Sequence, residues 1–185
     1  MVLSPITRNQ IEEKFGKPLR YPSDYDALSI DIKVATGERI SINTLKRLTG
    51  AIDDVKEPRL STLDIIAKYL GFNDWDVYIK NMSDDGNSSF GKDENSIDQK
   101  DLPIGCKVEF HYNPGRKVVL HKDSDMLFCV DESFGSKLRI NDRMEIGSFH
   151  LHYPLFSKNV TRGTEMLGPF TAGKISGLTY LKIIK

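Results

Sequence analysis

The residue types best suited to chemistry in this chain of 185 residues are four histidines, all in its second half. His150 and His152 are two positions apart, so a strand would place both on one face, a spacing that metal sites on sheets use. If residues 114–115 form a two-residue turn, His111 and His121 fall on opposite faces of a hairpin. No carboxylate or cysteine completes an obvious ligand set. We therefore expect solvated or partly packed histidines, without a metal or any other cofactor.

Catalytic chemistry finds little support in the sequence. The motifs GxSxG, GxxxxGK[ST], GxGxxG and HExxH do not occur. Cys106 and Cys129 lie in alternating apolar runs without CxxC spacing, where buried and inert thiols are expected. This cysteine usage fits a reducing cytosol, although a disulfide between the two stays open. The sequence predicts a protein that is not an enzyme.

The segment 29–71 carries the most regular pattern in the chain. Gly37 can turn the chain with a positive φ, and Ser41 can accept hydrogen bonds from the free amides that open the next helix. Apolar residues recur at helical spacing around this turn and mark the inner faces of two short helices: Ile30, Val34, Ile40, Leu45 and Leu48.

This order of signals resembles the helix-turn-helix of the phage-repressor or Cro type, over about residues 24–80. The most specific part of the resemblance is the stretch 59–71, where Ser61 stands as a cap and Gly71 as a stop. The inner face of that expected helix consists of Leu63, Ile66, Ala67 and Leu70. The resemblance implies an all-α domain that binds double-stranded DNA, as a homodimer that doubles its modest positive charge.

The resemblance makes the helix at 41–49 the reading helix, because the second helix of this motif enters the major groove. Asn43 then pairs with adenine and Arg47 with guanine, each contact contributing about 1–3 kcal/mol of discrimination. Phosphate contacts near the turn would fix the register without reading sequence. The implied DNA contacts are Ser29, Lys33 and Arg39 to phosphate, and Ser41, Ile42, Asn43, Lys46 and Arg47 in the reading helix.

A second interpretation stays open for the same residues. Glu38 and Arg39 widen the turn relative to the family's motif, and Asp53 and Asp54 would repel phosphate. Between residues 29 and 50, four basic residues face two acidic ones, an excess of only two. A leucine pair beside lysine and arginine is also typical of any solvated helix face. The alternative is a non-enzymatic protein-interaction module with a repressor-like fold that does not bind DNA.

Further helices are expected on both sides of this segment, within residues 1–81. Ser4 and the proline after it predict a helix over 5–15. Asn73 is expected to cap a last helix, and Trp75 and Tyr78 within it are expected to pack in the core.

Composition divides the chain into three parts. Residues 1–81 are expected to form the helical domain. Residues 82–101 hold six acidic and two basic residues and little that is apolar, which predicts a flexible acidic linker. Residues 102–185 alternate apolar and polar side chains between turns, which predicts a small all-β barrel or sandwich. The predicted fold class is therefore α+β.

Short strands are expected throughout the last part. A hairpin at 108–120 begins this part. Residues 102–185 also contain twelve basic and eight acidic residues, and this positive excess suits a partner surface, ligand sensing or oligomerisation. The other strands are expected at 126–130, 137–140, 143–151, 155–160 and 178–184.

The whole chain has twenty-six basic and twenty-six acidic residues, which excludes a strongly basic nucleic-acid coat. No apolar run follows its start, and no stretch approaches about 18 apolar residues, so we expect neither a secretion signal nor a membrane partner. The leading hypothesis is a cytoplasmic, bacterial transcriptional regulator that binds DNA through the first domain, with a protein partner or ligand bound by the second.

Overall fold

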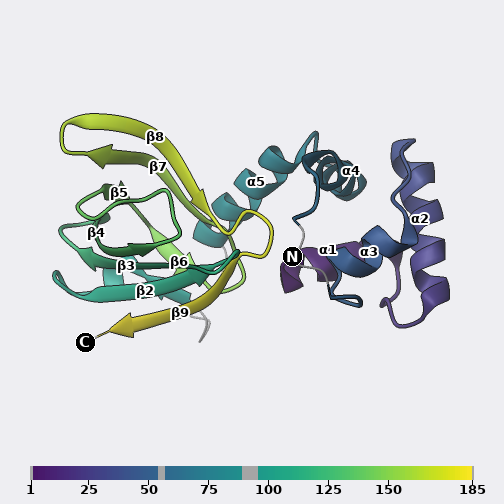
Figure 1. Ribbon diagram of the computed structural model, residues 1–185, viewed down its shortest axis with the longest axis horizontal. Coiled ribbons are helices and arrows are strands. Elements are labelled where there is room, and N and C mark those ends of the chain that lie inside the picture. Colours follow the sequence, from purple (N-terminus) through teal and green to yellow (C-terminus); the bar gives the residue numbers. More distant parts are fainter. Residues whose placement is uncertain (1, 54–56, 89–95, 185) are drawn as a thin grey trace. The chain divides into compact units, whose positions relative to one another are not determined.

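Helices precede strands in the computed structural model, which describes residues 2–53, 57–88 and 96–184 (Figure 1). The chain divides into two compact units, unit 1 over Met1–Asn81 and unit 2 over Met82–Lys185. Unit 1 is built from helices, and the strands belong to unit 2. The protein therefore has the α+β class that its sequence predicts.

Unit 1 begins with α1 (Pro5–Phe15), over the residues that the sequence predicts. The Ser4 hydroxyl accepts a hydrogen bond from the Thr7 amide at 3.1 Å and caps this helix. The helices that follow are α2 (Pro22–Thr36), α3 (Ile42–Leu48), α4 (Leu60–Leu70) and α5 (Trp75–Ser88). Within the described ranges, none of the helices has both the length and the apolar character needed to cross a bilayer.

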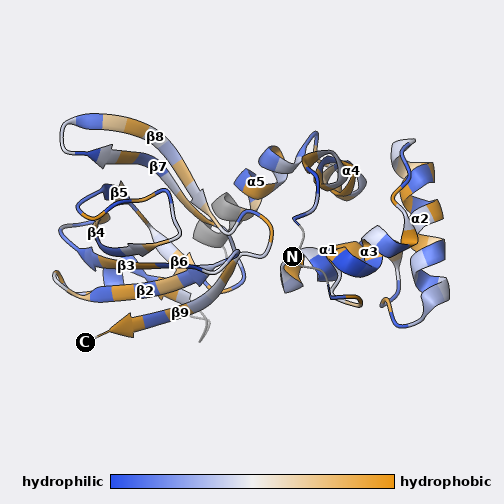
Figure 2. Cartoon of the chain, in the orientation of Figure 1, coloured by the Kyte–Doolittle hydropathy of each residue, from blue (hydrophilic) through white to orange (hydrophobic). Residues whose placement is uncertain are grey.

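α2 buries a different face from the predicted one. Ile30 and Val34, expected inside, are 54% and 80% exposed, whereas Leu28 and Ile32 are fully buried where α2 packs on α3 and α4. Both pairs have i, i+4 spacing and lie on nearly opposite sides of the helix, so their spacing could not distinguish them. α2 consequently carries apolar residues on both sides, visible as alternating colours along it in Figure 2.

α4 buries most of the face that the sequence predicts. Leu63, Ile66 and Ala67 lie in the core, and Gly71 ends the helix with a φ of 100°. The predicted cap at Ser61 is wrong, because the helix already begins at Leu60 and leaves Ser61 exposed in its first turn.

α5 starts one residue later than the predicted cap implies. The Asp74 carboxylate, instead of Asn73, accepts the Val77 amide at 2.8 Å. Trp75 and Tyr78 are buried in the core as predicted, with ring centroids 4.9 Å apart.

The stretch 82–101 has more regular structure than a flexible linker. α5 continues to Ser88, and β1 (Ser96–Asp98) is followed by a 3₁₀ turn, η1 (Gln99–Asp101). The part of the predicted linker at 89–95 lies outside the described residues.

Contacts with the rest of unit 2 order this entering segment. β1 pairs antiparallel with β6 (Ser148–His150). The buried Lys122 ammonium donates to the carbonyls of Gln99 and Leu102 at 2.7 and 3.0 Å. Hydrogen bonds to the rest of unit 2 thus stabilise a segment that has few apolar side chains to bury.

Unit 2 contains an antiparallel sheet of seven strands in the order β8-β7-β5-β4-β3-β2-β9 (Figure 1). Among the described strands, β8 and β9 do not pair with each other, so the sheet is open at both edges and the closure of a barrel is not seen. The strands are β2 (Lys107–Tyr112), β3 (Arg116–Lys122), β4 (Leu127–Phe134), β5 (Arg143–Glu145), β7 (Leu155–Arg162), β8 (Glu165–Ala172) and β9 (Leu178–Ile184).

Three details of the strand prediction differ from the structure. The strand expected at 143–151 is two short strands, β5 and β6, which belong to different sheets. Residues 137–140 form a loop, although Leu138 is buried as an inward strand residue would be. β8 was not predicted, because Gly168 and Pro169 inside it look like a turn in the sequence.

The core of unit 2 lies on one face of the sheet. Alternate residues of each strand point into it, and Phe110, Phe128 and Phe149 are fully buried there. The Phe149 ring lies 5.3 Å from that of Phe128 and 6.2 Å from that of Phe110, measured between centroids. The opposite face of β2, β3 and β4 carries a group of charged and ionisable side chains: Lys107, Glu109, His111, Lys117, His121 and Asp131.

Candidate nucleic-acid interface

α3 is held on unit 1 by apolar residues at both of its ends. Ile40, Leu45 and Leu48 are each at most 3% exposed. The Ser41 hydroxyl accepts the Thr44 amide at 3.2 Å, which is the predicted cap. This anchoring fixes which side of a seven-residue helix faces outward.

The widened turn before α3 is fixed at two points. Glu38 forms an ion pair of 2.8 Å with Lys68 of α4. The Arg39 guanidinium donates to the hydroxyl of Ser29 on α2 at 3.4 Å. Gly37, with a φ of 76°, ends α2 and allows the reversal. The two additional residues therefore tie the turn to both neighbouring helices.

Asn43 and Arg47 are both exposed on the outer side of α3. They are four positions apart, so they lie one above the other on the helix surface. Figure 2 shows strongly hydrophilic residues on this helix, whose last turn contains Lys46 and Arg47. An amide and a guanidinium aligned in this way can each form paired hydrogen bonds with the flat edge of a base.

Two of the predicted DNA contacts have other roles. Ser29 is fully buried, and its hydroxyl donates to the Ile40 carbonyl at 2.6 Å, so a phosphate contact at Ser29 is wrong. Lys46 is half-buried, with its ammonium 5.8 Å from the centroid of the Tyr25 ring. The sequence could not reveal these roles, because both depend on residues of other segments.

The remaining predicted contacts divide by exposure. Lys33 on α2 and Arg39 in the turn are exposed, as is Ser41, while Ile42 is half-buried. Of the two aspartates that would repel phosphate, Asp53 is exposed, and Asp54 lies outside the described residues.

Two acidic side chains near this surface, Asp31 and Glu38, already bind other residues of unit 1. Asp31 on α2 accepts a hydrogen bond of 2.5 Å from the hydroxyl of Tyr69, and burial together with this bond raises the pKa of that phenol. Lys68, the ion-pair partner of Glu38, has a raised pKa because of that contact. The ion pair with Lys68 offsets the negative charge of Glu38, which weakens the repulsion that an approaching phosphate would meet.

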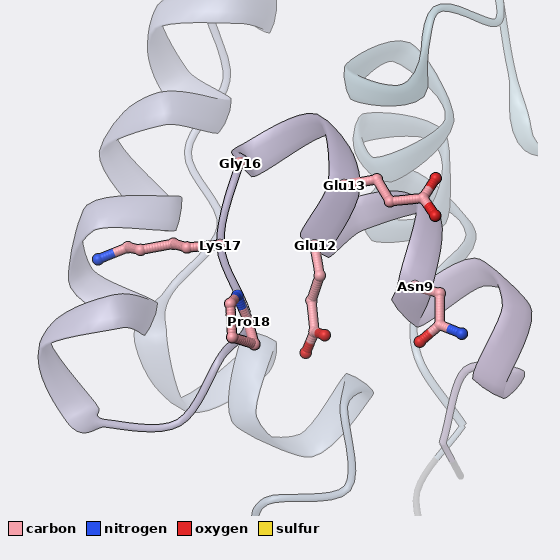
Figure 3. A pocket seen from close by; sticks show the side chains of 6 residues that line it. All are labelled: Asn9, Glu12, Glu13, Gly16, Lys17 and Pro18. Carbon is pink, nitrogen blue, oxygen red and sulfur yellow. The ribbon is translucent and has the colours of Figure 1, made fainter.

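A shallow hollow of about 390 Å³ lies beside α1, away from these residues (Figure 3). Of its polar side chains, Glu12 accepts hydrogen bonds from Arg8 at 3.0 Å and from the Leu19 amide at 3.2 Å. Lys17 points away from Glu12 in Figure 3, and its ammonium is 2.8 Å from the Asp24 carboxylate. Two of the polar side chains that line the hollow thus already bind other residues of unit 1.

The outer face of the unit 2 sheet carries two similar charged clusters. In the first, Glu109 lies 2.6 Å from the His111 ring nitrogen and 3.6 Å from the Lys117 ammonium. In the second, Asp131 lies 2.6 Å from His121 and 2.9 Å from Lys107. Each carboxylate is thus held between one histidine and one lysine.

Both carboxylates stay ionised readily. The hydrogen bond from His111 lowers the pKa of Glu109 and outweighs its burial. Burial opposes ionisation of Asp131, yet the bonds from Lys107 and His121 lower its pKa.

The predicted placement of the histidines is wrong in two respects. His111 pairs with Lys117, and His121 with Lys107, across a three-residue loop, so His111 and His121 share one face of the hairpin. His152 lies beyond β6 with a φ of 70°, so it does not share a strand face with His150.

Metal and thiol chemistry gain no support from these groups. In the described part of the chain, no three histidine, cysteine or carboxylate side chains form a cluster that could hold a metal. Cys106 and Cys129 are free thiols, and burial raises the pKa of Cys129. A thiol with a raised pKa is a poor nucleophile, so Cys129 is poorly suited to nucleophilic chemistry.

No family model matches the sequence, and comparison with curated proteins and with solved structures finds no significant match. The support for this candidate interface therefore comes from the structure of α2, the turn and α3 alone.

Proposed function

We propose that unit 1 binds double-stranded DNA, with α2, the turn at Gly37 and α3 acting as a repressor-like helix-turn-helix. The observation that carries this proposal is the exposed pair Asn43 and Arg47, one turn apart on the outer side of a helix that Ser41 caps. In this motif the amino-terminal residues of the second helix contact base edges. Asn43 lies in that part of α3, and Arg47 lies one turn further on, in its last turn.

Each exposed group has a distinct role in this proposal. Asn43 and Arg47 contact base edges, and each accounts for about 1–3 kcal/mol of sequence discrimination. Arg39 contacts phosphate beside the amino end of α3 and sets the register. Unit 2 presents its polar sheet face to a protein partner, and the protein acts as a cytoplasmic regulator of transcription.

The experiment begins by selecting bound duplexes from a random-sequence pool with the full chain. Fluorescence anisotropy then measures the affinity for a selected duplex. Arg47→Ala and Asn43→Ala should each weaken that affinity by about 5- to 150-fold, with little effect on unselected duplexes. Arg39→Ala should weaken both and reduce the slope of log affinity against log salt by about one.

Lys80→Ala is the matched control, because Lys80 is an exposed cation on α5, away from α3 in the sequence. It should leave the affinity for the selected duplex unchanged. Absence of any retained duplex at about 50 mM salt, with the protein folded by circular dichroism, would reject DNA binding.

A second candidate function is protein interaction without DNA. It is favoured by the apolar residues on the outer side of α2, where Ile30 and Val34 are exposed. This function would survive the loss of duplex binding.

A further inference from the structure

The outer side of α2 presents an apolar stripe flanked by opposite charges. The Ile30 side chain is 54% exposed and that of Val34 is 80% exposed. Ala27, three positions before Ile30, is half-buried. Asp26 and Lys33 are also exposed on this helix. Neither of these two charges has an ion-pair partner among the described residues.

The helical period sorts these residues into two flanks around Ile30. At about 100° per residue, Ala27 and Val34 lie on one side of Ile30, and Asp26 and Lys33 lie on the other. One flank is therefore apolar, and the other combines an acid with a base.

The spacing along the helix makes this arrangement self-complementary. With a rise of about 1.5 Å per residue, Lys33 lies about 4.5 Å beyond Ile30, and Asp26 about 6 Å before it. In a second, antiparallel α2 related by a two-fold axis at Ile30, each Lys33 faces an Asp26. On the other flank each Val34 faces the small side chain of Ala27.

We propose that the outer side of α2 is a homodimer interface, occupied by α2 of a second copy in antiparallel orientation. Burial of Ile30 and Val34 supplies the attraction, and two Asp26–Lys33 ion pairs between the copies set the direction. This inference does not depend on DNA binding, although a two-fold dimer would double the positive surface offered to a duplex.

One pair of helices is a small interface. It buries less than the roughly 1,600 Å² of a standard protein interface, so we expect a dissociation constant on the order of 10–100 µM. Sedimentation of the full chain between about 5 and 500 µM should therefore show a shift from monomer to dimer.

Charge reversal gives the sharpest test. Asp26→Lys places an ammonium group against Lys33 of the other copy, and Lys33→Asp places two acids together, so each variant alone should sediment as a monomer. In an equimolar mixture, both contacts join opposite charges again. The mixture should then form a heterodimer at least as stable as the unmodified dimer.

Two further variants control for the change in net charge. Glu13→Lys and Lys80→Asp make the same changes at exposed positions of α1 and α5. Each should dimerise like the unmodified chain. Ile30→Glu should remove dimerisation, both alone and when introduced into the mixed pair, while circular dichroism shows an unchanged fold.

A chain that stays monomeric at all concentrations overturns the proposal. A mixture of Asp26→Lys and Lys33→Asp that associates no more than either variant alone also overturns it. Neither result bears on the binding of the selected duplex by Arg47 and Asn43, so the two proposals can fail separately.

Discussion

Asp24 is a single side chain on which the start of α2 depends. Its carboxylate accepts hydrogen bonds from the Lys17 ammonium at 2.8 Å and from the amides of Tyr21 and Arg20 at 2.7 and 3.0 Å. The bond from Lys17, followed by that from the Tyr21 amide, lowers the pKa of Asp24 from 3.8 to about 2. The ionised form is therefore the one that the folded unit prefers.

The lowered pKa of Asp24 predicts a pH dependence of stability. A carboxylate with a depressed folded pKa stabilises the fold above its ordinary value of 3.8, and this contribution is lost as the pH falls through about 2. Asp24→Asn should therefore lower the melting temperature at pH 6, and the difference from the unmodified protein should shrink steadily between pH 4 and pH 2.

Circular dichroism at several pH values measures both melting temperatures. Asp53→Asn, at an exposed position, serves as the control and should run parallel to the unmodified protein. A difference for Asp24→Asn that stays constant down to pH 2 would contradict the assigned role.

Among the elements, α3 is the shortest helix of unit 1, with seven residues. So short a helix has little stability of its own, and its position comes from the core contacts of Leu45 and Leu48 and from the cap at Ser41. The orientation of Asn43 and Arg47 therefore depends on the cap as well as on the core.

Ser41→Ala should cost about 0.5–2 kcal/mol of unfolding free energy, because the first amides of α3 lose their acceptor. It should also weaken binding of the selected duplex, since α3 would fray at its amino end. Ser61→Ala is a close control, because Ser61 does not cap α4 and is exposed. Urea unfolding compares the two, and equal losses would argue against the cap.

Capping residues and glycines in the sequence correctly predicted where helices of unit 1 begin and where the chain turns. Ser4 and the proline after it correctly located the start of α1, and Gly37 with Ser41 correctly located the turn and the start of α3. The buried face of α2 could not be predicted in the same way, because Leu28 with Ile32 and Ile30 with Val34 satisfy the same period. Only packing against α3 and α4 distinguishes them.

Errors in unit 2 have a similar physical origin. A loop of three residues in place of two moved the register of β2 and β3 by one position and put His111 and His121 on the same face. The pairing of these histidines with Glu109 and Asp131 follows from that register. The alternating charges of β2 and β3 were the available signal, but the loop length had to be known first.

At the scale of the whole molecule, each unit has its own buried core. Unit 1 contains the only tryptophan, Trp75, which is 1% exposed. Unit 2 contains a partly buried ion pair, in which the half-buried Arg162 guanidinium binds the fully buried Asp142 carboxylate through two bonds of 2.8 Å. Burial opposes ionisation of Asp142, yet Arg162 and the Arg139 amide lower its pKa.

Asp142→Ala should lower the free energy of unfolding of unit 2 by about 1.5–3 kcal/mol, because the Arg162 guanidinium and the Arg139 amide lose a charged hydrogen-bond acceptor. Because each core belongs to one unit, we expect the urea transition followed by circular dichroism of the sheet to shift. The transition followed by Trp75 fluorescence should stay in place. Lys158→Ala, at an exposed position of β7, is the control. Equal shifts of both signals would show that the units unfold together.

The grip of Lys122 on the carbonyls of Gln99 and Leu102 has a mechanical consequence. Tension applied to the chain before β1 reaches the strands of unit 2 through the segment 96–102. There the load is shared between the backbone hydrogen bonds that join β1 to β6 and the two hydrogen bonds of the Lys122 ammonium. Because β6 carries Phe149, part of this load passes directly to the aromatic side chains of the core.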